Sequence, residues 1–189
     1  MEDIVIVGFG GHAKSIADCI ERMGTYRIAG YTDFDEHPSK YRYLGTDAML
    51  QSIFDGGVKK AVVGVGYLGK GDIRCRLYRL LKDIGFELPV IADPSAVISD
   101  SAVIGEGTFI GKNAVINTEA VVGRMTIINT MALVEHECVI EDFVHVAVAA
   151  ILCGQVKVGE AAFVGANATV IQCREIPAHK IVPAGITVR

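Results

Sequence analysis

The chain has 189 residues and a net charge of -4, and its lysines and arginines are scattered without a basic run. Because nucleic-acid binding needs clustered basic side chains, nucleic acid is excluded as an expected partner. No stretch reaches the roughly 18 apolar residues of a membrane-spanning helix, so no membrane association is expected. The acidic start and five cysteines without C-x-x-C spacing predict a cytoplasmic protein that needs no metal.

The first half of the chain alternates between short apolar runs and segments of helical spacing. Ile4 to Val7 is an apolar run that ends at glycines, as a buried parallel strand does. Strands are predicted at 4–7, 27–32, 61–65 and 88–91, and helices at 12–23, 48–54 and 73–84. Strands that alternate with helices predict an α/β, Rossmann-like domain over residues 1–92, with a parallel sheet covered on both faces.

The pattern changes at Asp93-Pro94, after which an apolar residue recurs at every sixth position. The series is Ile98, Ile104, Ile110, Ile116, Val122, Ile128, Val134, Ile140, Val146, Leu152, Val158, Val164 and Val170. A mostly small residue stands two places before each member. Gly or Asn often stands directly after it, where a turn with positive φ is expected. A period of six is the hexapeptide repeat of a parallel β-helix, here with about four coils of three short strands.

The end of the chain is predicted to depart from this repeat. The period continues through Ile176, Val182 and Val188, but the residues that flank these positions do not suit the corners of a coil. These flanking residues are Arg174, Pro177, Lys180 and Pro183. The β-helix domain is therefore assigned to residues 93–189, with residues 176–189 as an extended tail or a partial coil.

Four segments resemble a known family. They are Val7-Gly8-Phe9-Gly10-Gly11-His12-Ala13, Gly30-Tyr31-Thr32-Asp33, Val134-Glu135-His136-Glu137-Cys138-Val139-Ile140 and Phe143-Val144-His145-Val146. Together they are similar to the bacterial sugar acetyltransferases with hexapeptide repeats, which include the N-acetyltransferases of bacillosamine and perosamine biosynthesis and the sialic-acid O-acetyltransferases. The resemblance covers nearly the whole chain. It implies a left-handed β-helix, a homotrimer, acetyl-CoA bound between neighbouring β-helices and a nucleotide sugar held by the N-terminal domain.

His136 is the predicted catalytic base. Acetyl transfer from a thioester to an amine needs a group that removes a proton from the attacking nitrogen, and a neutral imidazole suits that role. By resemblance, Glu137 orients the ring, and this pairing requires a turn because adjacent residues on a strand point in opposite directions. Glu135 and Asp142 are alternative partners for the ring. Cys138 is a nearby nucleophile, but its position in the repeat predicts burial.

Three further residues are assigned to the acetyl-CoA site by the same resemblance. His145 is expected to line the site near the thioester. Gly154 and Ala166 are expected where small residues let the backbone approach the pantetheine arm.

A glycine-rich loop follows the first predicted strand. Gly8, Gly10 and Gly11 precede the helix that is predicted to begin at His12, and the N-terminus of a helix favours a phosphate. His12 is expected beside the sugar or the pyrophosphate. Asp33 stands 20 residues after Ala13, where dinucleotide-binding folds carry an acidic residue. The loop alone therefore also fits a nicotinamide-dependent oxidoreductase, but the first half supplies only one mononucleotide unit. The loop and Asp33 are assigned to a nucleotide sugar, and Gly66 and Arg74 are expected to close the same pocket.

The favoured function is an acetyl-CoA-dependent N-acetyltransferase that acts on a nucleotide-linked 4-amino sugar. An O-acetyltransferase of sialic acid or another sugar hydroxyl would use the same repeats and the same histidine. A non-catalytic β-helix binding subunit is the alternative from a different class. It predicts that His136→Ala leaves function intact.

Overall fold

The computed structural model describes residues 1–69 and 71–189. It divides into two compact units, the first comprising residues 1–66 and 72–89 and the second comprising residues 67–71 and 90–189. In the part of the chain that the structure describes, no helix is both long enough and apolar enough to cross a membrane.

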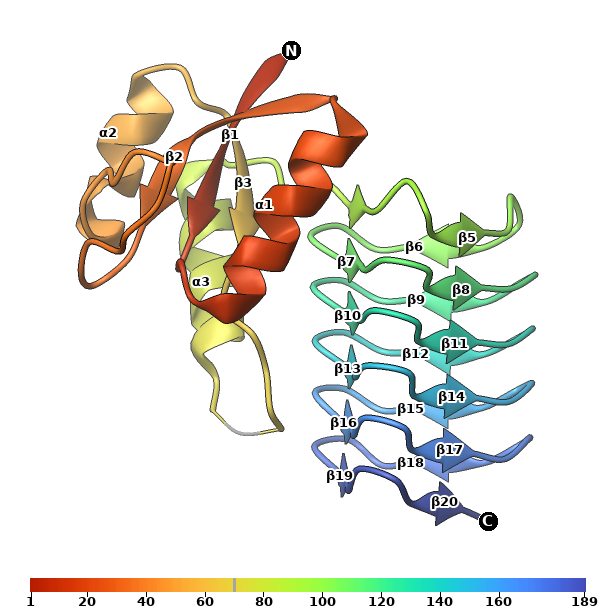
Figure 1. The fold of residues 1–189 in the computed structure, drawn as a ribbon. Helices are drawn as coiled ribbons and strands as arrows, with labels where there is room; N and C mark the ends of the chain where they lie inside the picture. Colours follow the sequence, from red (N-terminus) through yellow and green to blue (C-terminus); the bar gives the residue numbers. More distant parts are fainter. Residues whose placement is uncertain (70) are drawn as a thin grey trace. The chain divides into compact units, whose positions relative to one another are not determined.

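The first unit is built on a parallel sheet with the strand order β2-β1-β3. The strands are β1 (Glu2–Val7), β2 (Tyr26–Thr32) and β3 (Lys60–Val63). The helices are α1 (Gly11–Met23), the 3-10 helix η1 (Asp47–Met49), α2 (Leu50–Asp55) and α3 (Ile73–Ile84). Helix α1 lies on one side of the sheet and α2 and α3 lie on the other, so both faces are covered (Figure 1). Ile4 to Val7 are fully buried at the centre, as the apolar run predicts.

The predicted fourth strand at 88–91 is wrong. Lys60 and Glu87 form only an isolated parallel bridge, and Pro89 lacks the N–H that a continuing ladder would need. Ile91 belongs instead to β4 (Ile91–Ala92), which is the first strand of the second unit.

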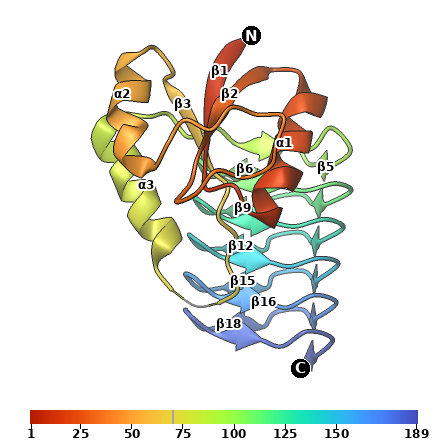
Figure 2. The same cartoon turned by 60° about the vertical axis from the view of Figure 1, so that its left-hand side comes forward.

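The second unit is a parallel β-helix whose strands of two residues form three sheets, here called faces 1, 2 and 3 (Figure 2). Face 1 contains β4, β7 (Phe109–Ile110), β10 (Ile127–Ile128), β13 (His145–Val146), β16 (Phe163–Val164) and β19 (Ile181–Val182). Face 2 contains β5 (Val97–Ile98), β8 (Val115–Ile116), β11 (Leu133–Val134), β14 (Ile151–Leu152), β17 (Thr169–Val170) and β20 (Thr187–Val188). Face 3 contains β6 (Val103–Ile104), β9 (Val121–Val122), β12 (Val139–Ile140), β15 (Lys157–Val158) and β18 (Glu175–Ile176).

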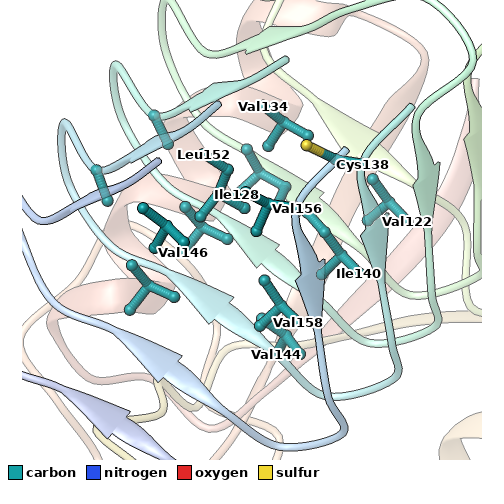
Figure 3. Close-up of a cluster of buried hydrophobic side chains, with 14 of the residues drawn as sticks. Val122, Ile128, Val134, Cys138, Ile140, Val144, Val146, Leu152, Val156 and Val158 are labelled. Atoms are coloured by element: carbon teal, nitrogen blue, oxygen red, sulfur yellow. The ribbon is translucent and has the colours of Figure 1, made fainter. Parts of the chain in front are cut away.

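Successive coils are in register at a spacing of 18 residues. Ile128 pairs with Ile110 on one side and with Val146 on the other. The apolar residue of each hexad and the residue two places before it both point into the prism, where they form one continuous core (Figure 3). The small residues at the second position let the three sides of the triangle meet, since Ala114 and Ala132 are fully buried there.

The last coil corrects the prediction of a tail. Residues 175–188 form β18, β19 and β20 in the same register, and Ile176 and Val182 are buried. In earlier coils the N–H after the inward residue donates to the next coil, as Gly159 does to the Ile176 carbonyl at 2.8 Å. Pro177 and Pro183 take the positions of Gly159 and Gly165 one coil on, and the strands beside them keep the register although proline has no N–H.

The left-handed turn position was also predicted wrongly. Positive φ occurs three residues after the inward residue, not one, and Gly or Asn is not needed there: Met131, Glu137, Phe143 and Ala149 all have φ between 54° and 60°. A hydrogen bond to the previous coil holds each turn, such as Glu137 N–H to the Thr118 carbonyl at 3.0 Å. Glycine occurs directly after the inward residue for another reason, which is the close approach of the next coil. A Cβ at Gly111 would lie 2.7 Å from the backbone nitrogen of Thr130 in the next coil.

Candidate functional site

His136 lies on the corner between face 2 and face 3, in the turn from β11 to β12. Its Nδ1 is 3.0 Å from Oε2 of Glu137. This contact between adjacent residues is possible because Glu137 has a φ of 57°, which bends the chain as the pairing requires. Both side chains are about half exposed, at 49% and 46%. The histidine therefore has a partner and is still open to a ligand.

The carboxylate of Glu137 has a second donor. Gln155, one coil further on, donates from Nε2 to the same Oε2 at 3.1 Å. The hydrogen bonds from His136 and then Gln155 hold the pKa of Glu137 below its usual range. Because an ionised carboxylate only accepts, the proton of a neutral His136 ring lies on Nδ1. Nε2 then carries the lone pair that a general base needs.

Gly154 lies against the ring of His136. A Cβ at Gly154 would overlap Nε2 and Cε1 of the imidazole. Residue 154 must therefore be glycine if the His136 ring is to keep this position. Its backbone lies beside Nε2, the nitrogen that would accept a proton. Gly154 thus lies at the corner of His136, whereas the resemblance predicted a contact with the pantetheine arm, which stays a prediction.

The alternative partners of the ring are engaged elsewhere. Oε2 of Glu135 accepts from the Asn117 side chain at 2.9 Å and from the His136 backbone N–H at 3.2 Å. Asp142 pairs with the guanidinium of Arg124. Cys138 is buried as predicted, and burial raises the pKa of its thiol, which makes it a poor nucleophile.

His145 is held in a different environment. It is 6% exposed on face 1, and its Nδ1–H donates to the main-chain carbonyl of Tyr67. Asn129 Nδ2 donates to its Nε2 at 3.1 Å, and the ring of Phe163 packs edge-on against it. These contacts fix one tautomer of a buried histidine. Its predicted role beside a thioester stays a prediction.

Ala166 lies on a different corner from His136 and Gly154. It follows β16 and so stands between faces 1 and 2, whereas Gly154 follows β14 between faces 2 and 3. Within one chain, Gly154 therefore lies beside His136, whereas Ala166 lies on another corner of the β-helix. Ala166 is exposed, so it is open to a ligand or to another copy of the chain.

The first unit contains a pocket of about 250 Å³ at the carboxyl ends of β1 and β2. Of the predicted substrate residues, Gly8 and Asp33 line it. The other lining residues are Phe34, Thr46, Asp47, Ala48, Val65, Ile73 and Leu77. This volume is below the usual range for a whole small-molecule ligand, so it suits one part of a larger one, such as a base or a sugar ring.

Gly8 is required by the geometry of this pocket. Its φ is 83°, and a Cβ would overlap the side chain of Val65. Gly10 is the N-cap of α1 and Gly11 its first residue, and neither has atoms within 4 Å of the place a Cβ would take. The N-terminus of α1 is therefore open on that side, as an approach by a phosphate requires.

Asp33 organises the loop around it. Its Oδ2 accepts from the Phe9 backbone N–H at 2.7 Å and lies 3.0 Å from Nε2 of His37, and its Oδ1 accepts from the Phe34 N–H at 2.7 Å. Burial alone would raise the pKa of Asp33, but these hydrogen bonds outweigh it and lower the pKa. Much of its hydrogen-bonding capacity thus serves the protein's own backbone.

His12, Gly66 and Arg74 are not among the described residues that line this pocket. The place of a Cβ on Gly66 is 3.5 Å from Cβ of His12. Arg74 is buried, and its guanidinium donates to the carbonyl of Val65. Burial lowers the pKa of Arg74 to about 10, so it remains charged at neutral pH. This hydrogen bond holds the segment that follows β3. The sequence predicted a contact between Arg74 and the substrate instead.

Comparisons with known proteins identify the family. The family described as PglD N-terminal domain matches residues 3–80. Perosamine N-acetyltransferase from Caulobacter crescentus, solved with CoA and GDP-perosamine, is 34% identical, with a TM-score of 0.93 over 100% of this chain and 89% of that one. The chain belongs to the sugar acetyltransferases with hexapeptide repeats. By this membership it is an acyltransferase.

Two further relatives in this sugar acetyltransferase family are similar over different extents. The acetyltransferase domain of PglB from Neisseria gonorrhoeae, solved with acetyl coenzyme A, is 30% identical with a TM-score of 0.82, covering 99% of this chain and 95% of that one. UDP-N-acetylbacillosamine N-acetyltransferase from Bacillus subtilis is 36% identical over 115 residues. That match spans 57% of this chain but only 50% of the relative.

Several contacts of this acetyltransferase could not be found by motif. Asp47 and Thr46 line the pocket of the first unit, and Asp47 accepts from the Thr32 hydroxyl at 2.8 Å. Gln155 reaches Glu137 only because coils repeat every 18 residues. That repeat length was available in the sequence, and adding 18 to residue 137 leads to Gln155.

Proposed function

We propose that this protein is an N-acetyltransferase that moves the acetyl group of acetyl-CoA to the 4-amino group of a nucleotide-linked sugar. The observation that carries the proposal is the His136–Glu137 pair, with Nδ1 engaged at 3.0 Å and Nε2 left as a proton acceptor. The relatives support the substrate class, since perosamine N-acetyltransferase was solved with CoA and GDP-perosamine. In two of its complexes a single histidine is replaced, by asparagine or by alanine.

The proposed reaction is a direct attack in a ternary complex. The neutral amine attacks the thioester carbon, a C–N bond forms, and Nε2 of His136 takes a proton from the nitrogen. A backbone N–H stabilises the oxyanion. The C–S bond then breaks, and the CoA thiolate leaves with the proton that His136 returns. Glu137 holds the Nδ1–H and stabilises the imidazolium that forms between these steps.

The first unit is proposed to hold the nucleotide part of the substrate. Gly8 and Asp33 line a pocket large enough for one ring, and the N-terminus of α1 beside it would favour the pyrophosphate. In this reading Asp33 acts mainly through the loop that it shapes. Its remaining lone pairs could accept from the base or the ribose.

A homotrimer completes the proposal, with acetyl-CoA between neighbouring β-helices. Faces 2 and 3 meet at the His136 corner, and both carry exposed aliphatic side chains. These include Val97, Val103, Val121, Val139 and Ile151. Flat apolar faces on a prism suit packing against identical copies. His145 and Ala166 would then contribute to the cofactor site from another corner. We place this assembly in the cytoplasm, which the cysteine spacing favours.

The test is a thiol-release assay with acetyl-CoA and a panel of UDP-, GDP- and dTDP-linked 4-amino sugars and free sialic acid. Turnover on an amino sugar is expected, with kcat reduced about 10³-fold in His136→Ala, the range of a lost general base. His179→Ala is the matched control, because His179 is also an exposed corner histidine.

Each of the other outcomes would contradict the proposal in its own way. Turnover on sialic acid alone would indicate O-acetylation. No thiol release, together with no CoA binding by calorimetry, would indicate a binding subunit. Binding of a nicotinamide cofactor without CoA would indicate an oxidoreductase. Sedimentation as a monomer would remove the proposed site between subunits.

A further inference from the structure

A column of three polar side chains runs along the His136 corner. Glu137, Gln155 and Cys173 occupy the same turn position in three successive coils, 18 residues apart. All three have left-handed backbone conformations, with φ of 57°, 61° and 59°. The shared backbone conformation directs their side chains the same way, so each lies beside the next along the stack.

The hydrogen bonds in this column have a defined direction. Glu137 accepts at Oε2 from Nε2 of Gln155 at 3.1 Å. Oε1 of Gln155 then accepts from Sγ of Cys173 at 3.3 Å. The orientation of the amide is fixed at both ends, because the carboxylate can only accept and the thiol here donates.

Glu137 needs such support. A glutamate with a half-exposed side chain has three rotatable bonds, and water competes for its carboxylate. Its hydrogen bond to His136 joins two half-exposed groups, and such contacts are weak by themselves. Gln155 donates to the same oxygen that holds the ring, so it favours the one rotamer in which Glu137 meets Nδ1.

We propose that Gln155 is a positioning residue for His136, acting through Glu137. This inference rests on the proposed function, in which His136 is the base. Gln155 keeps the carboxylate beside Nδ1, the carboxylate keeps the neutral ring in the Nδ1–H tautomer, and Nε2 is thereby kept as the acceptor. Gln155 touches none of the reacting atoms in this scheme.

The first test reads the tautomer directly. In protein labelled with ¹⁵N-histidine, the ring signals of His136, assigned by their loss in His136→Ala, report which nitrogen carries the proton. Gln155→Met keeps the side-chain length but removes both amide groups. The population of the Nδ1–H tautomer is expected to fall, and kcat is expected to fall about tenfold with KM for acetyl-CoA unchanged.

The matched control is Gln172→Met, which removes an exposed glutamine from the adjacent position of the same corner. It is expected to leave the tautomer and kcat as in the wild type. Gln155→Asn, one methylene shorter, provides a second variant if Gln155→Met does not fold. An unchanged tautomer ratio in a folded Gln155 variant would overturn the inference.

A double-mutant cycle tests whether Gln155 works through Glu137. In a Glu137→Ala background, Gln155→Met should have no further effect on kcat. A second tenfold loss in that background would mean that Gln155 acts elsewhere, and would overturn the proposed route. If the wild type proves inactive on every acceptor, the proposed function fails. The tautomer measurement still decides what Gln155 does to His136.

Discussion

The two units of this protein use repetition very differently. In the β-helix, each inward position recurs in every coil, so Ile110, Ile128 and Val146 share one environment. In the first unit, each residue of the candidate site makes a contact that occurs once, such as Gly8 with Val65 or Arg74 with the Val65 carbonyl. Substituting one residue of a repeated core should therefore have a different effect from substituting a residue of the first unit, whose contact no other residue repeats.

The core of the β-helix gives the largest expected effect on stability. Ile128 is fully buried between Ile110 and Val146, so Ile128→Ala should lower the free energy of unfolding by about 2–5 kcal/mol. Chemical denaturation followed by circular dichroism measures it. Because each coil contacts mainly its neighbours, Val188→Ala at the edge of the stack should cost less. An equal loss at both positions would show that the stack behaves as one block and not as a repeat.

The same regularity explains what could be predicted from the sequence. The six-residue period predicted the β-helix and the burial of Cys138, because burial in a repeat follows from position alone. The prediction failed at the last coil, because Pro177 and Pro183 do not fit the residue pattern of the earlier corners, yet the strands beside them keep the register. It also placed positive φ at the wrong residue, because Gly111 is required by the backbone of the next coil and not by a turn.

The site was predictable where chemistry is local and not where it depends on tertiary contacts. The pairing of His136 with Glu137 was predicted from the family resemblance, and it needs only the turn between these adjacent residues. The burial of His145 under Tyr67 depends on a segment 78 residues away, and no local pattern records it. Arg74 likewise reads as a substrate ligand in sequence, but in the structure it bonds to the backbone of its own unit.

The next prediction separates two glycines of the β-helix. The three atoms nearest to a Cβ at Gly154 all belong to the half-exposed ring of His136, so Gly154→Ala should displace the ring and lower kcat about 100-fold with little change in stability. A Cβ at Gly111 meets the backbone of Thr130, so Gly111→Ala should cost about 1–3 kcal/mol of stability and change kcat little. Steady-state kinetics and denaturation on both variants check the pair. A reversed pattern would mean that the His136 ring is not where catalysis needs it.

The smallest expected effect lies in the first unit, at Asp33. Its carboxylate accepts from the backbone of Phe9 and Phe34, and the folded pKa is lowered. A lowered pKa means that the charged form is preferred in the folded state. The stability that Asp33 adds is therefore complete above its unfolded pKa of about 3.9 and is lost as the pH falls through the lower folded value.

Asp33→Asn should accordingly cost about 1–2 kcal/mol near pH 7, because asparagine keeps one accepting oxygen but loses the charge that strengthens these hydrogen bonds. The difference from wild type should begin to shrink below about pH 4, where the carboxyl of the unfolded chain becomes protonated, and should disappear only below the lower pKa of the folded protein. The variant should also raise KM for the nucleotide sugar while kcat changes little, because Asp33 shapes a binding loop in the unit that lacks His136. Denaturation at several pH values and initial-rate kinetics measure both effects. If Asp33→Asn lowered kcat alone, Asp33 would take part in the chemical step. That result would contradict the proposal that the first unit binds the nucleotide sugar and the second carries out the acetyl transfer.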